Sequence, residues 1–234
     1  GNSVNLVAST GKVNETYELG FTDPYATDDG VSRTYKLGKR DTDVSSLVVS
    51  AFSSSTESAS INFGVPLTEY DRIFYGVGFE QTGITLGLNP TREYQEFVDL
   101  NGKNNTIIPL TVGWSRDKRD SALFPTDGLL QRFASELSTP LGDITYYNFT
   151  YKSEWYRPLT ETFTLRLGGS LAYAEDFDGK QLPFYKKFYA GGASSLRGYQ
   201  VSSLGPKDST GLALGGKRRL LSQAELLFPW PGLN

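Results

Sequence analysis

The chain has 234 residues and contains no cysteine, no histidine and no methionine. The missing cysteines exclude a disulfide framework and thiolate metal sites. Without histidine, most zinc sites and most pairs of a nucleophile with a general base are excluded as well. Ser194 and Ser195 therefore have no base to activate them. We expect neither an enzyme nor a bound cofactor or metal.

Long apolar runs are also missing. No stretch of about 18 apolar residues exists, which excludes a transmembrane helix. The net charge is -3, and the charged residues are scattered along the chain, so no basic patch for binding nucleic acid is present. The mean hydropathy of -0.35 is that of a soluble protein, but a transmembrane β-barrel has a similar average because its lipid-facing and lumen-facing residues alternate. No initiator methionine and no signal peptide are present, which favours an internal piece of a longer chain.

The pattern that the chain does have is alternation. Apolar residues recur at every second position in segments of about ten residues, the length that a tilted strand needs to cross a bilayer. The pattern predicts one all-β domain over 1–234, an antiparallel up-and-down transmembrane β-barrel; a soluble β-sandwich or lipocalin-like barrel is the alternative. The expected strands cover 4–9, 16–22, 32–40, 58–67, 72–80, 108–115, 129–137, 145–157, 163–173 and 219–228. Between them we find no helical period of convincing length.

The connections between these strands fall into two kinds. Those at 67–71 and 158–162 are tight and polar, whereas those at 82–106 and 174–216 are long, as expected of an outer-membrane barrel. Acidic clusters at 28–30 and 175–179 end in Asp-Gly and indicate turns rather than calcium sites. Aromatic residues near the strand ends suit interfacial girdles, and these are Tyr25, Tyr70, Trp114, Trp155, Tyr156 and Trp230.

Residues 184–199, FYKKFYAGGASSLRGY, combine aromatics, glycines and one arginine with no obvious core to bury them. Gly191, Gly192 and Gly198 allow backbone conformations that a Cβ forbids, so we expect a loop of specific shape. Arg197 within it is expected to be paired rather than simply solvated. Glu225 is the candidate partner, because alternation in the last strand places it on the lumenal face and a lumenal carboxylate needs a partner or water. The alternative is two charges that are each solvated in a wet lumen.

Several short motifs follow one another in a fixed order. They are TDPY at 22–25 with DGVS at 29–32, GW at 113–114 with FPTDG at 124–128, YAGG at 189–192 with LRGY at 196–199 and GP at 205–206, and GG at 215–216 with ELLFP at 225–229. Together they resemble the barrel of the BamA family, the outer-membrane protein assembly factors of Gram-negative bacteria. The resemblance extends essentially from end to end of the chain. It implies a sixteen-stranded barrel preceded by periplasmic POTRA domains, which folds and inserts outer-membrane proteins without ATP.

The motif alignment implies that this chain spans strands 3 to 12 of such a barrel. The POTRA domains and the seam between first and last strands, the family's proposed substrate gate, are then absent. The resemblance places Leu196, Arg197, Gly198 and Tyr199 where the family has a Val-Arg-Gly-Phe motif tucked into the lumen. It places Glu225 where a lumenal acid of strand 12 pairs with that arginine. We call the six residues Gly191, Gly192, Leu196, Arg197, Gly198 and Tyr199 the latch loop, and the predicted lumen-inserting loop that carries it covers 174–216.

The resemblance also implies a place and partners. The expected location is the outer membrane of a Gram-negative bacterium. The expected partners are outer-membrane lipid, nascent β-barrel proteins and Bam lipoproteins, the last mainly through the absent POTRA domains, and no nucleic acid. Two other functions remain as alternatives, a protein-export transporter of the same superfamily and a passive porin or adhesin.

Overall fold

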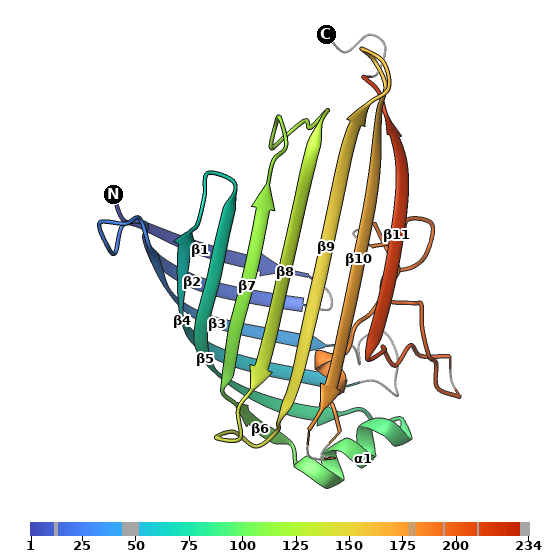
Figure 1. Ribbon diagram of the computed structural model, residues 1–234. Coiled ribbons are helices and arrows are strands. Elements are labelled where there is room, and N and C mark those ends of the chain that lie inside the picture. Colours follow the sequence, from blue (N-terminus) through green and yellow to red (C-terminus); the bar gives the residue numbers. More distant parts are fainter. Residues whose placement is uncertain are drawn as a thin grey trace.

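The chain folds into one antiparallel sheet, shown in Figure 1. The computed structural model describes residues 1–11, 14–43, 52–177, 179, 181–193, 195–209 and 211–229. Ten strands pair in the order β1-β2-β3-β4-β5-β7-β8-β9-β10-β11, and the short β6 pairs with β5. The elements are β1 (Ser3–Thr10), β2 (Asn14–Asp23), β3 (Ser32–Asp43), β4 (Phe52–Pro66), β5 (Asp71–Leu86), α1 (Arg92–Asn101), β6 (Asn104–Ile107), β7 (Pro109–Asp117), β8 (Gly128–Ser138), β9 (Tyr146–Pro158), β10 (Thr164–Asp176), the 3-10 turn η1 (Phe184–Lys186) and β11 (Arg218–Leu227).

All ten strands expected from alternation are present, and both tight connections are reverse turns. Leu67 and Thr68 donate backbone hydrogen bonds to the carbonyl of Asp71, and Leu159 donates to the carbonyl of Phe163. The sheet twists strongly, so that β1–β4 pass behind β7 and β8 in Figure 1. It does not close within the described residues, because β1 and β11 each pair on one side only.

The expectation that no helix lies between the strands is wrong. Within 82–106, β5 runs on to Leu86 and α1 follows, capped by the side chain of Thr91, which accepts a hydrogen bond from the backbone N–H of Tyr94 at 3.4 Å. Only three residues of α1 are buried, Tyr94, Phe97 and Val98. Such a short apolar stripe on a ten-residue helix is a weak periodic signal beside the strands that flank it.

No helix in the described part of the chain is long and apolar enough to span a membrane.

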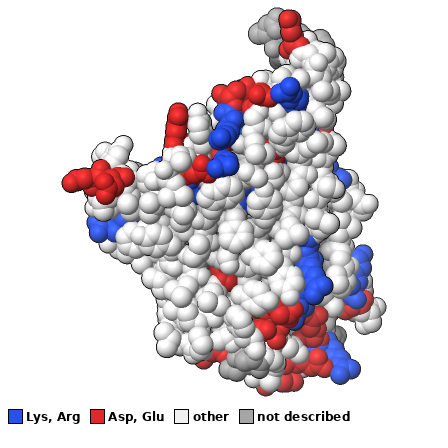
Figure 2. All heavy atoms as spheres, viewed as in Figure 1, with Lys and Arg blue, Asp and Glu red and all other residues white. Residues whose placement is uncertain are grey.

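The cross-strand register sorts the side chains into two faces. On the outer face, Leu19 lies opposite Leu37, Leu37 opposite Ala59 and Ala59 opposite Phe79. Figure 2 shows that the outer face of β7–β10 carries little charge along most of its length, with charged residues gathered toward the strand ends. The inner face carries polar and charged residues and contacts the loop between β10 and β11. An apolar band between two charged rims is the pattern of a membrane-spanning barrel wall.

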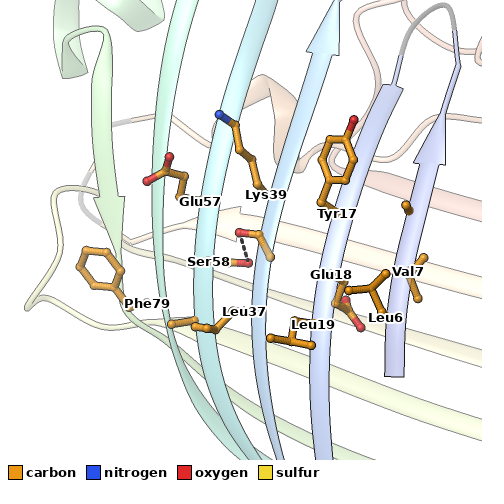
Figure 3. A pocket seen from close by; sticks show the side chains of 13 residues that line it. Leu6, Val7, Tyr17, Glu18, Leu19, Leu37, Lys39, Glu57, Ser58 and Phe79 are labelled. Atoms are coloured by element: carbon orange, nitrogen blue, oxygen red, sulfur yellow. Dashed lines mark hydrogen bonds between the residues drawn. The ribbon is translucent and has the colours of Figure 1, made fainter. Parts of the chain in front are cut away.

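A shallow depression on the outer face of β1–β5 marks one border of the apolar band (Figure 3). Leu6, Leu19, Leu37 and Phe79 lie along its apolar side, while Tyr17, Lys39 and Glu57 project along the other. The change from aliphatic to charged side chains within one step of the alternation is expected where the hydrocarbon layer ends.

The apolar core sits at one end of the sheet, where α1 and η1 meet the inner face. We call this the α1 end, and the opposite end, with the tight connections at 67–70 and 159–163, the turn end. The core consists of Phe52, Ile84, Tyr94, Phe97, Val98, Ile107, Ile144, Tyr146, Ala174, Leu182 and Phe184.

This core corrects the expectation that the aromatics of 184–199 have nothing to bury them. Phe184 is only 1% exposed, and its ring centroid lies 4.4 Å from those of Phe52 and Tyr94 and 5.3 Å from that of Phe97. The partners come from β4 and α1, far away in the sequence, so local composition did not reveal them.

Candidate functional site

The loop between β10 and β11, residues 177–217, folds back onto the inner face of the sheet. This is slightly shorter than the predicted 174–216 at its start, because β10 continues to Asp176. Antiparallel bridges within the loop join Phe188 to Gly216 and Ala190 to Leu204. The loop is thus an ordered segment with its own backbone pairing, and it is held to the wall at several points.

Two lysines join the start of the loop to other elements. Lys186 Nζ lies 2.7 Å from Glu80 Oε2 of β5 and 3.4 Å from Glu136 Oε1 of β8. Lys187 forms an ion pair with Glu93 of α1. These contacts are only partly exposed, so they are stronger than ordinary surface pairs. Together with the burial of Phe184 they hold the first part of the loop at the α1 end.

Tyr189 continues this attachment toward the latch loop. Burial raises the pKa of its hydroxyl to about 12, although a hydrogen bond with Tyr94 opposes the shift. The hydroxyl is therefore neutral at physiological pH and donates toward the carbonyls of Phe184 and Leu214, at 3.4 and 3.5 Å. A neutral phenol can remain in this apolar surrounding at little cost, because its polar atom is satisfied.

The latch loop is a compact turn built on glycine. Gly191, Gly192 and Gly198 all have positive φ, at 111°, 94° and 88°. A Cβ on Gly191 would lie 2.2 Å from the carbonyl oxygen of Gln200, so only glycine fits there. The hydroxyl of Ser195 closes the turn, since it accepts from the N–H of Gly191 and lies within donating distance of its carbonyl, both at 2.9 Å. This turn presents Arg197 to the neighbouring strand.

The structure brings Arg197 and Glu225 together, but Arg197 is not the main partner of Glu225. Arg197 Nη1 lies 3.4 Å from Glu225 Oε1, and the arginine side chain is 78% exposed. Arg166 of β10 lies directly opposite Glu225 in the register. Its Nη1 donates to Glu225 Oε2 at 2.6 Å, and its side chain is only 17% exposed.

Arg166 belongs to a chain of charges that crosses three strands. Its Nη2 lies 3.2 Å from Glu154 Oε1 of β9, and Glu154 also pairs with Lys152 at 2.7 Å. The hydroxyl of Tyr156 donates to Glu154 Oε2 at 2.9 Å. We call Lys152, Glu154, Arg166 and Glu225 the wall network, and Arg197 reaches its last member from the loop.

Sequence reasoning assigned no partner role to Arg166 or Glu154. The signal was present, because alternation already placed both on the lumenal face of their strands. What was missing was the register between β9, β10 and β11, which decides which lumenal residues stand opposite one another. The assignment of Tyr156 to an interfacial girdle is wrong, and alternation alone contradicts it, because Tyr156 follows Glu154 by two residues and so shares its lumenal face. It points inward, is 5% exposed and serves the wall network.

The inner face of β11 holds the segment around the latch loop at two further points. Arg219 Nη1 donates to the carbonyl of Tyr189 at 2.9 Å, and the side-chain amide of Gln223 donates to the carbonyl of Ser195. Arg219, Gln223 and Glu225 share one face of the strand, so they form a track along which the loop lies. Two of the three contacts are to backbone carbonyls and therefore depend on the shape of the loop rather than on its side chains.

The other predicted residues of the latch loop differ in exposure. Leu196 is partly buried, whereas Tyr199 is 54% exposed. Ser194 and Trp230 lie outside the described residues. No group of three or more acidic side chains that could hold a metal ion occurs in the part of the chain that the structure describes.

Comparison with known proteins gives the family. The model of the Omp85 superfamily domain matches residues 1–234. The chain belongs to the Omp85 superfamily. The predicted family and the predicted barrel fold are thereby confirmed, and the open sheet is a segment of such a barrel.

Individual Omp85 relatives agree with this placement. The outer membrane protein assembly factor BamA of Neisseria meningitidis serogroup B is 38% identical, over 99% of this chain and 31% of its own length. A SAM50-like protein of Schizosaccharomyces pombe is 30% identical, over 58% of this chain and 30% of its own length. The crystal structure of BamA from Haemophilus ducreyi lacking POTRA domains 1-3 matches with a TM-score of 0.91 and 27% identity, over 100% of this chain and 48% of that one. The chain thus spans about a third of the length of these curated relatives.

Proposed function

We propose that this Omp85 chain forms part of the barrel wall of an outer-membrane assembly factor that folds and inserts other β-barrel proteins. The similarity to BamA over nearly the whole chain supports the proposal, as do the two-faced strands that suit an outer membrane. In this role the chain works without ATP and without enzymatic chemistry. Its partners are outer-membrane lipid and nascent barrel proteins, with Bam lipoproteins bound mainly through POTRA domains outside this segment.

The single observation that carries the proposal is the attachment of the latch loop to β11. The loop is anchored at the α1 end by a buried aromatic cluster and is joined to the wall by Arg197 and Glu225. Together these attachments keep the lumenal loop in one position relative to β11. Fixed geometry of the loop relative to β11 is then what the segment contributes to assembly.

Insertion of a client barrel protein into lipid vesicles by the purified full-length protein tests this function. Arg197→Ala and Glu225→Ala should each slow insertion several-fold, because each removes the ion pair between the latch loop and β11, and Glu225→Ala also removes a partner of Arg166. Matched controls are Arg40→Ala, an exposed inner-face arginine of β3, and Glu161→Ala in the 159–163 turn, neither of which forms an ion pair within the described chain. If the unmodified protein inserts the client no faster than vesicles without protein do, the assembly role is contradicted. Normal insertion by both latch variants would contradict the role of the loop.

A further inference from the structure

A row of cations crosses the inner face of the wall, away from the latch loop. Arg72 of β5 lies opposite Ser115 of β7, and Ser115 lies opposite Arg132 of β8. Arg132 in turn lies directly opposite Lys152 of β9. We call Arg72, Arg132 and Lys152 the cation row. All three side chains are exposed to the space enclosed by the sheet.

Like charges in this arrangement are unfavourable for folding. Cations directly opposite each other on adjacent strands repel and destabilise the pair. Lys152 is partly compensated by Glu154 at 2.7 Å, but neither Arg72 nor Arg132 forms an ion pair within the described residues. Asp117 on β7 is held by Arg119 at 2.8 and 2.7 Å and also attracts Arg132 electrostatically, which offsets part of the charge of Arg132. The row still keeps a surplus of positive charge, carried mainly by Arg72, in a chain whose net charge is -3.

Space for a ligand lies directly beside the row. The next inner-face positions toward the α1 end are Phe74 on β5 and then Gly113, Ala134 and Thr150, which are cross-strand partners in that order. The small side chains on β7–β9 allow a bound backbone to approach the sheet there, beside Phe74, whose atoms lie 3.7 and 3.8 Å from the position of a Cβ on Gly113. The long loop is fastened to β11 and to the α1 end, and it leaves the cation row exposed.

From this geometry we infer that the cation row binds an extended acidic polypeptide segment that enters the lumen. Adjacent strands are about 4.8 Å apart, so the row from β5 to β9 spans about 14 Å. In an extended peptide, side chains on one face recur about every 6.7 Å, so three alternate acidic residues span about 13 Å. The total lengths agree, but the cations stand on the first, third and fourth of these strands, about 9.6 and 4.8 Å apart, so the long arginine side chains must reach sideways by about 3 Å to place one carboxylate on each cation. A single phosphate is too small to engage all three, which is why we commit to a peptide. The inference does not depend on the assembly role.

Binding of a labelled synthetic peptide by the full-length protein in non-ionic detergent tests the inference. The peptide carries Glu at every second position with Thr between, and its control carries Gln in place of Glu. We expect the Glu peptide to bind, with affinity that falls as salt rises, and the Gln peptide not to bind. Arg72→Gln with Arg132→Gln should weaken binding about tenfold, which corresponds to about 1.4 kcal/mol.

Matched variants separate the row from general charge effects. Lys39→Gln removes an exposed cation from the outer face and should leave binding unchanged. Arg72→Lys with Arg132→Lys keeps the charges and should retain most of it. Equal binding of the Glu and Gln peptides would overturn the inference. This comparison uses only the unmodified protein, so it does not depend on whether a variant folds. Equal affinity of the double Gln variant and the unmodified protein would overturn it as well. Displacement of the peptide by inorganic triphosphate at lower concentration than by unlabelled peptide would overturn the choice of a peptide as the occupant.

Discussion

Arg166 stands directly opposite Glu225 and donates to it at 2.6 Å, whereas Arg197 approaches the other oxygen of the same carboxylate only to 3.4 Å. One acid therefore serves two arginines, one from the wall and one from the loop. Because Arg166 is mostly shielded from water, Glu225 stays paired when Arg197 moves away. The loop can then detach without leaving a bare charge on the wall, where an unpaired carboxylate would be costly.

Because Arg166 is the main partner of Glu225 and Arg197 a weaker one, replacing them should have different effects on stability. Arg166→Met should lower the free energy of unfolding by about 1–3 kcal/mol, because both Glu154 and Glu225 lose a partner while they remain partly shielded. Arg197→Met should change it by less than about 1 kcal/mol, since its side chain is 78% exposed. Urea unfolding of the full-length protein in lipid vesicles measures both. An effect of Arg197→Met as large as that of Arg166→Met would show that the loop arginine is the main partner.

The glycines of the latch loop allow a matched pair of substitutions. Gly191→Ala and Gly198→Ala both place a Cβ at positive φ, and that strain costs each of them about 1 kcal/mol. Only Gly191→Ala adds a clash, with its Cβ 2.2 Å from the carbonyl of Gln200, while nothing lies within 4 Å of a Cβ on Gly198. We expect faster hydrogen exchange across 189–204 in Gly191→Ala than in Gly198→Ala. Equal exchange in the two variants would mean that the turn adapts freely.

The aromatic core at the α1 end should anchor the whole long loop. Phe184→Ala removes a side chain that is 1% exposed and should cost about 3–5 kcal/mol in the free energy of unfolding. Phe177→Ala serves as the control, because that ring is 59% exposed near the start of the same loop. Limited proteolysis within 181–217 reports the anchoring directly. Protease resistance in Phe184→Ala that equals that of Phe177→Ala would contradict it.

Asp120, in the connection between β7 and β8, predicts a dependence on pH. Its carboxylate accepts hydrogen bonds from the hydroxyl and N–H of Thr126 and from the N–H of Asp127, which lower its pKa to about 2. Because the pKa is lowered, these bonds stabilise the connection at any pH above about 3.8, the ordinary pKa of an aspartate. This stabilisation is lost as the pH falls through about 2. Carboxyl-carbon NMR of the labelled protein should follow this titration. A midpoint near 3.8 would show that the hydrogen bonds do not persist in solution.

The strands and the faces of their side chains could be predicted from the sequence, because alternation is a local property. The pairing of Arg197 with Glu225 was accessible through the lumenal position of Glu225 and the shape that the glycines impose. Arg166 was not recognised as a partner, since its place opposite Glu225 depends on the register of two strands separated by a long loop. The burial of Phe184 depends on Phe52 and Tyr94, and α1 shows only one short apolar stripe. What escaped prediction arises from contacts between distant segments.

The central claim is that the ionic contact between Arg197 and Glu225, together with the contacts of Arg219 and Gln223, holds the latch loop on β11. These 234 residues contain no cysteine, so Ser195→Cys with Gln223→Cys introduces a single pair once any cysteine elsewhere in the full-length protein is replaced by serine. Its reaction with a short thiol crosslinker reports whether the loop is seated. The account predicts efficient crosslinking in the full-length protein, a several-fold lower yield when Arg197→Ala or Glu225→Ala is added, and no change with Arg40→Ala. An undiminished yield with Arg197→Ala and with Glu225→Ala would contradict it.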